Sequence, residues 1–126
     1  LSGRQIDHAI RPLFPKDYFY ETQVSILVLS YDQENDADIL GLIGGAAALH
    51  ISDIPFKGPL SATRVGRVDG AFLINPTSTN LDESDLDFVV TGTPDYIMSL
   101  EGSAHEILED DLTEAILLCH ESIKNN

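Results

Sequence analysis

Hydrophobic and polar residues alternate in recognisable patterns along this 126-residue chain. Pro12 and Pro15 limit an opening helix to about Ile10. The segment QVSILVLSYD (23–32) is apolar on both faces, which predicts an interior strand covered on both sides. Residues 38–51 predict a helix whose small side chains, from Gly44 to Ala48, allow close packing on the sheet.

The second half of the chain predicts strands followed by a helix. Residues 61–76 indicate two strands joined at Asp69-Gly70, a strong hairpin signal. DLDFVVTGT and YIMSLEGSA predict two more strands, and LTEAILLCHESIK predicts a final helix with acidic residues before it. The order α-β-α-β-β-β-β-α predicts an α+β or mixed α/β domain, with helices packed on a mostly antiparallel mixed sheet.

Composition and charge narrow the class of partner. The hydrophobic fraction of 43% is typical of a folded domain, and no apolar run reaches membrane-spanning length, so we expect no membrane partner. The net charge is −14, but residues 1–67 carry only −2 of it and six of the seven bases. A polyanion is therefore expected to dock only against the first half. The chain begins without Met, so we expect a processed chain or a fragment.

The cysteine and histidines give weak signals for chemistry. The single Cys119 excludes an intrachain disulfide and fits a reducing compartment, and core packing is favoured over a nucleophilic role. His8, His50, His105 and His120 occupy separate elements without partners at ligand spacing, so a zinc site is disfavoured. His50 and His105 could still meet in space.

The acidic segment LDESDLDF (81–88) has two interpretations. Asp85 and Asp87 lie two residues apart, and on a strand they would point the same way and could hold a hard cation. Alternatively they form the solvent face of a strand whose Leu86, Phe88 and Val90 face the core. Composition alone favours the second interpretation.

Longer motifs add a family resemblance. GRQIDHAIRPLFP, SDIPFKGPLSATRVG, LINPT and DLDFVVTGT resemble the polynucleotide phosphorylase family, in register from about Ser2 to the final helix. The match is to the latter part of the first of two ribonuclease-PH-like domains, so residues 1–126 are expected to be part of that domain in a longer multidomain protein.

The resemblance implies a fold and a reaction. The family has a ribonuclease-PH-like β/α fold, assembled as a ring-shaped homotrimer around an RNA channel. It degrades RNA, including mRNA, by 3′-to-5′ phosphorolysis. Inorganic phosphate is the co-substrate, Mg²⁺ or Mn²⁺ is required, and the reverse reaction adds nucleotides. A bacterial cytoplasmic location, or alternatively an organellar one, and partners from an RNA-degradation assembly follow from the same resemblance.

This domain departs from the motifs of the catalytic domain of the family. Asp36, Ala37 and Asp38 stand where the active domain has a serine-rich phosphate loop, and a carboxylate at a helix N-terminus repels phosphate. Asp85 falls on the second of two metal-binding aspartates, but the first falls on Thr79. The resemblance therefore implies a non-catalytic copy without a metal, in which Asp85 is a remnant.

Arg4 and Arg11 are the candidate RNA-binding residues, since they match basic positions of the family, and His8 replaces a third. The expected role is to build the trimer ring and line the RNA path. Two rivals remain: a catalytic domain that uses Asp85 and Asp87, and a scaffold without RNA contact. The net charge supports the scaffold. For Arg4 and Arg11 the alternative to RNA binding is a salt bridge to Asp7, Asp17 or Glu21. We also expect the apolar 23–32 strand to be covered by more of a longer chain or by another copy.

Overall fold

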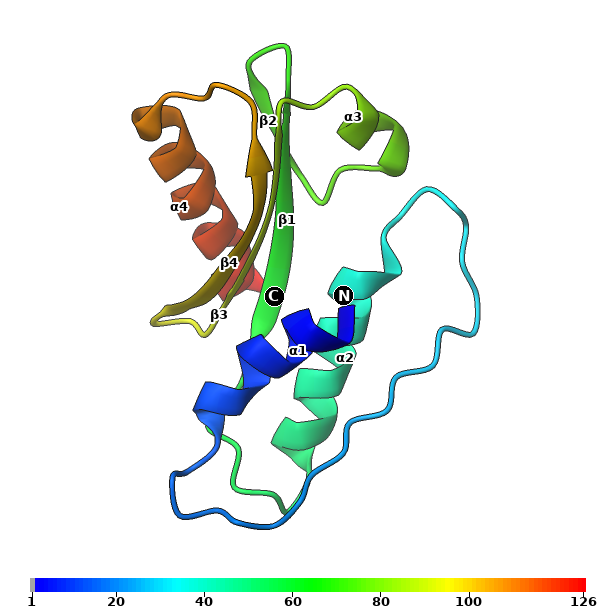
Figure 1. Cartoon of the computed structure of the whole chain (residues 1–126), viewed down its shortest axis with the longest axis vertical. Helices are drawn as coiled ribbons and strands as arrows, with labels where there is room; N and C mark the ends of the chain where they lie inside the picture. The colour runs from blue at the N-terminus through cyan, green and yellow to red at the C-terminus, as the bar shows by residue number, and fades with distance from the viewer. Residues whose placement is uncertain (1) are drawn as a thin grey trace.

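The computed structural model describes residues 2–126, which form an α+β unit (Figure 1). Helices cover both faces of one antiparallel sheet, whose strand order is β2-β1-β3-β4. In chain order the elements are α1 (Ser2–Ile10), the 3₁₀ turn η1 (Arg11–Leu13), α2 (Ala37–Ile51), β1 (Ser61–Val68), β2 (Ala71–Ile74), α3 (Ser78–Asp82), β3 (Leu86–Gly92), β4 (Ile97–Ala104) and α4 (Glu109–Asn125).

The hairpin between β1 and β2 forms where the sequence predicts it. Val68 pairs with Ala71, and the two turn residues have positive φ, +51° at Asp69 and +79° at Gly70. Two residues with positive φ make the type I′ geometry that matches the twist of the flanking strands. The predicted α+β class and the antiparallel pairing are confirmed.

The sheet separates two apolar cores. Alternation along β1 turns Ala62 toward α1 and α2 and turns Val65 toward α4. Ala46 of α2 is buried with Ala62, so the small-sided helix packs directly on the sheet, as expected. On the opposite face Cys119 is buried with Val65. No helix within residues 2–126 is long and apolar enough to cross a bilayer.

The predicted interior strand at 23–32 is wrong. Residues 14–36 contain no helix or strand, and residues 20–36 run beside α2, on the side away from α4 (Figure 1). A side chain added at Gly45 of α2 would lie 3.2 Å from Ile26 Cδ1 and 3.3 Å from Val24 Cγ1. The segment is extended and apolar, but it rests on a helix and has no neighbouring strand to pair with. The sequence analysis also missed the short helix α3, which Thr77 caps by accepting from the Asn80 N–H.

Candidate functional site

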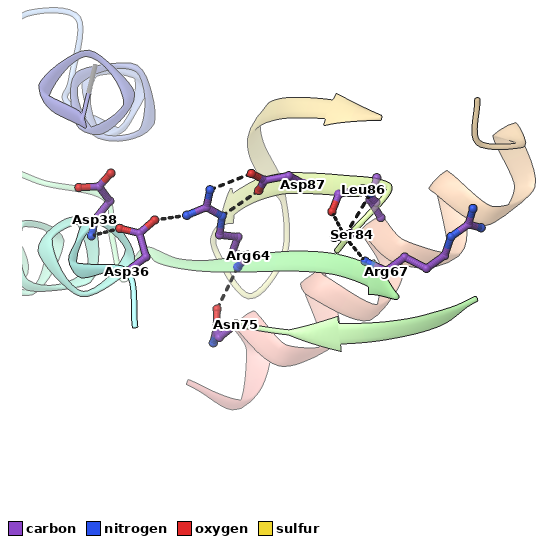
Figure 2. A network of polar contacts seen from close by, with 8 residues as sticks. All are labelled: Asp36, Asp38, Arg64, Arg67, Asn75, Ser84, Leu86 and Asp87. Carbon is purple, nitrogen blue, oxygen red and sulfur yellow. Dashed lines mark hydrogen bonds and ion pairs between the residues drawn. The ribbon is translucent and has the colours of Figure 1, made fainter. Parts of the chain in front are cut away.

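A polar cluster is built around Arg64, in the middle of β1 (Figure 2). Its Nε and Nη2 donate to Asp87 Oδ1 and Oδ2 on β3, each at 2.8 Å. Its Nη1 donates to Asp36 Oδ2 at the start of α2. One guanidinium therefore joins two strands and a helix, and it already meets two carboxylates.

Asp36 is held in this cluster by its position before α2. Its Oδ1 accepts from the Asp38 N–H at 2.9 Å, which makes it the N-cap residue of the helix. The carboxylate therefore satisfies a backbone donor and the positive end of the helix dipole. The prediction that carboxylates occupy this helix N-terminus is confirmed.

The backbone of Arg64 is held in place as well, by Asn75. The Arg64 N–H donates to Asn75 Oδ1 at 3.0 Å, and the Asn75 N–H donates to the Arg64 carbonyl at 2.7 Å. Asn75 has φ +50°, a left-handed conformation that Asn tolerates better than most residues. Asn75 thus fixes the backbone of Arg64 on one side, and Asp87 holds its side chain on the other.

A second arginine of β1 forms a similar cluster on the other face of the sheet. Arg67 Nε and Nη2 donate to Asp85 at 3.0 and 2.7 Å, and Nη1 donates to Asp111 Oδ2 of α4 at 2.9 Å. The hydrogen bonds from Arg67 lower the pKa of Asp85, against the opposing effect of desolvation. This cluster ties α4 to β1.

Asp85 and Asp87 do not project from one side of a strand, so that prediction is wrong. β3 begins at Leu86, and Asp85 precedes it and turns to Arg67 on the α4 face. Asp87 lies within β3 and meets Arg64 on the α2 face. The core face of β3 is as expected, with Leu86 and Val90 buried.

The carboxylates do not fit the divalent metal that the family resemblance implies. An arginine occupies the place of a cation beside each of them, and they lie on opposite faces of the sheet. Within residues 2–126 no group of three or more His, Cys, Asp or Glu is placed to hold a metal ion. Thr79, where the family resemblance implies that an aspartate is missing, donates its hydroxyl to Glu34 Oε1 at 3.0 Å.

The two candidate RNA-binding arginines lie at α1 and η1. Arg11 Nε and Nη2 donate to the carboxylate of Asp7 at 3.1 and 2.6 Å, so one of the salt bridges weighed as an alternative is present. Arg4 is exposed and makes no ion pair with another described residue. His8 lies with its Nδ1 3.7 Å from Glu101 Oε1 of β4.

The thiol and the remaining histidines lie apart. Burial raises the pKa of Cys119 to about 12, which fits its core position. His50 and His105 sit beyond opposite ends of β3. His50 lines a cavity with Gly92, whereas the His105 N–H donates to the Asp85 carbonyl. His120 Nε2 contacts the Thr93 carbonyl at 3.1 Å.

Sequence reasoning gave neither Arg64 nor Arg67 a role. The only sequence signal was their spacing, since residues three apart on a strand point to opposite faces. Their partners are distant in sequence: 23 and 28 residues away for Arg64, and 18 and 44 for Arg67.

Comparison with known proteins identifies two matching segments. Residues 1–55 match the profile described as "3' exoribonuclease family, domain 1", and residues 58–122 match "3' exoribonuclease family, domain 2". Leu42 and Ala62, one from each segment, belong to the same core.

Curated relatives carry one name. The chain is 54% identical over 124 residues to a protein named "Polyribonucleotide nucleotidyltransferase" from Chlorobium phaeovibrioides, covering 98% of this chain and 17% of that protein. It is 53% identical to the protein of the same name from Thermomicrobium roseum, covering 98% and 16%. For the one from Deinococcus deserti the identity is 53%, covering 95% and 17%. The chain thus spans about one sixth of the length of the relatives it matches, and by its two matching segments it belongs to the 3′ exoribonuclease family.

Proposed function

We propose that this chain is a segment of a polynucleotide phosphorylase, which degrades RNA from the 3′ end with inorganic phosphate and adds nucleotides in reverse. The similarity to polyribonucleotide nucleotidyltransferases over 98% of the chain supports this proposal. Within that enzyme the segment is a non-catalytic part of the first ribonuclease-PH-like domain. Chemistry then resides in a part of the protein that these 126 residues do not include.

One observation supports the non-catalytic role. The guanidinium of Arg64 is paired with Asp36 and Asp87, and Asp36 also caps α2. A phosphorolytic site must bind the attacking phosphate with cationic groups and backbone N–H donors. Here the helix N-terminus and the arginine beside it are both satisfied by carboxylates. An incoming phosphate would have to displace a bidentate carboxylate next to a second negative charge.

Phosphate and the divalent metal, Mg²⁺ or Mn²⁺, would accordingly bind elsewhere in the parent enzyme. The segment would help to build a homotrimeric ring and line its RNA path, with Arg4 and Arg11 as contacts to the phosphate backbone. The same proposal places the parent in mRNA breakdown, in a bacterial cytoplasm or an organelle, together with other RNA-degrading proteins.

Release of nucleoside diphosphate from poly(A), with phosphate and Mg²⁺, tests the proposal. The 126-residue chain should show no turnover, and Asp85→Asn and Asp87→Asn should leave that result unchanged. Sustained turnover by the chain, lost in either variant, would establish the rival catalytic site and overturn the non-catalytic role.

A scaffold without RNA contact is a second candidate, favoured by the pairing of Arg11 with Asp7. The full-length parent distinguishes the two. If Arg11 contacts a phosphate, Arg11→Ala weakens RNA binding equally across sequences and lowers the salt slope by about 1. Asp7→Asn, the matched control, removes the competing carboxylate and should strengthen binding. Unchanged affinity and salt slope in both variants would establish the scaffold.

A further inference from the structure

Three basic side chains form a stripe along one side of the first helix. Arg4, His8 and Arg11 are four and three positions apart, which is the spacing of neighbours on one helical face. All three are exposed, whereas Ala9 and Ile10, on the opposite side of the helix, are buried in the core that α1 shares with α2. The middle member of this basic stripe is a histidine, the side chain whose charge ordinarily changes between pH 5 and 8.

Two carboxylates flank the basic stripe. Asp7 accepts from Arg11 Nε and Nη2 at 3.1 and 2.6 Å. On the other side, Glu101 of β4 places its Oε1 atom 3.7 Å from His8 Nδ1, with both side chains about half exposed. With His8 neutral, the two arginines and the two carboxylates therefore balance one another, and protonation of His8 leaves the stripe with one net positive charge.

The neighbouring groups allow this change of charge. The hydrogen bonds from Arg11 lower the pKa of Asp7, and the charge of a protonated His8 lowers it further, so Asp7 stays ionised while a histidine titrates. Besides η1 and β4, α1 packs on α2, whose ionisable side chains lie at its two ends, at Asp38 and His50. The charge balance around the imidazole is therefore set by the stripe, Asp7 and Glu101.

We propose that protonated His8 is a third contact to the RNA backbone, so that affinity for RNA rises as the pH falls. The inference rests on the proposed RNA contact of Arg4 and Arg11 and adds its regulation by pH. The carboxylate of Glu101 beside Nδ1 favours a proton on that nitrogen, so in the neutral ring Nε2 is a hydrogen-bond acceptor. A phosphate oxygen is also an acceptor, and the two atoms repel.

Protonation reverses the character of Nε2. The imidazolium donates from both ring nitrogens, so Nδ1 faces Glu101 while Nε2 donates to a phosphate oxygen in a charge-assisted hydrogen bond. Phosphate and proton then favour each other's binding by the same factor, since coupling between two binding sites is reciprocal. RNA binding takes up a proton, and a lower pH strengthens it.

The affinity of the full-length parent for oligo(U) with hydroxyl ends, without inorganic phosphate, tests the inference. Neither uracil nor such ends titrate between pH 6 and 8, and no phosphorolysis occurs. From about pH 8 to about pH 6 the affinity should rise about three- to fivefold, and the salt slope should steepen by about 0.7. Calorimetry in buffers of different ionisation enthalpy should show proton uptake on binding at the pH where affinity changes.

Variants assign the effect to one side chain. His8→Gln should reduce the pH dependence and keep the weaker affinity seen at pH 8, whereas His8→Arg should bind at pH 8 as tightly as the wild type binds at pH 6. His105→Gln, at an exposed histidine of the acidic half, is the matched control and should keep the wild-type pH dependence.

Two results would overturn the inference: an affinity of the wild type that does not rise as the pH falls, or a rise of the same size in His8→Gln. If Arg11→Ala still weakens RNA binding in either case, the proposed RNA contact stands and only the role of His8 fails. If neither Arg11→Ala nor His8→Gln changes RNA binding at any pH, the RNA contact of this segment fails as well.

Discussion

Replacing Arg64 by Met tests whether the arginine clusters hold the helices on the sheet. The substitution keeps much of the apolar stem of the side chain but removes the guanidinium, so Asp36 and Asp87 lose their shared cation. Both carboxylates would then stand close together without a counter-charge. The start of α2 would lose its tie to β1 and β3.

The size of the effect follows from burial. Truncating one partner of a fully buried pair costs about 3–5 kcal/mol, whereas an exposed pair contributes about 0–1 kcal/mol. The side chains of Arg64, Asp36 and Asp87 are 20%, 28% and 39% exposed, so water screens the pair in part. We expect a loss of about 2 kcal/mol of unfolding free energy. That corresponds to a fall in Tm of about 6–10 °C for a domain of this size.

Thermal and urea unfolding measure this loss, and Arg11→Met is the matched control. Arg11 also makes a bidentate pair with an aspartate, but its side chain is 75% exposed, so its removal should leave Tm almost unchanged. Hydrogen exchange should also quicken in the first turn of α2. Equal losses from the two substitutions, or no loss from Arg64→Met, would refute a structural role for the Arg64 cluster.

Three further outcomes are expected. Arg67 lowers the pKa of Asp85 in the folded chain, so the ionised Asp85 stabilises the fold at pH above its unfolded pKa of about 3.9. This stabilisation is lost as the pH falls through the lower, folded pKa. The urea midpoint should therefore fall further between neutral and acid pH in the wild type than in Asp85→Asn. Cys119, with its pKa raised to about 12, should react with a thiol reagent at mildly alkaline pH only on unfolding, and rapid labelling of the folded chain would contradict its burial. Gly70 has φ +79°, so Gly70→Ala should lower the unfolding free energy by about 1 kcal/mol, whereas Gly44→Ala in helix α2 should raise it by up to about 1 kcal/mol. Neither added methyl group meets a neighbour, so the difference reports the backbone alone. A change of the same sign in the two unfolding free energies would contradict this argument.

Local signals in the sequence predicted most of the elements. The Asp69-Gly70 turn was predictable because few residue pairs accept two positive φ angles in succession. The burial of Leu86 and Val90 followed from alternation along β3. Both inferences use only residues that are neighbours in the sequence.

The errors arose where a distant partner decides the outcome. Residues 23–32 have strand composition, but pairing requires a second backbone, and no local pattern reveals whether one is adjacent. Asp85 escaped the two-residue alternation because it lies one residue before β3, where its N–H donates to the Arg67 carbonyl at 3.1 Å. The arginine clusters depend on contacts between residues 18 to 44 positions apart.

The arginine clusters also determine where a polyanion could approach. Arg64 and Arg67 each pair with two carboxylates, which neutralise the arginine charge, so neither cluster attracts phosphate from solution. Among the described cations, Arg4, Lys16 and Lys57 are exposed without an ion pair, and all three lie in the first half of the chain. The Lys57 N–H donates to the Leu13 carbonyl at 2.9 Å, which brings the loop before β1 against η1. If the chain contacts RNA as proposed, these unpaired cations place the contact on the surface of α1, η1 and that loop, away from the two arginine clusters of the sheet.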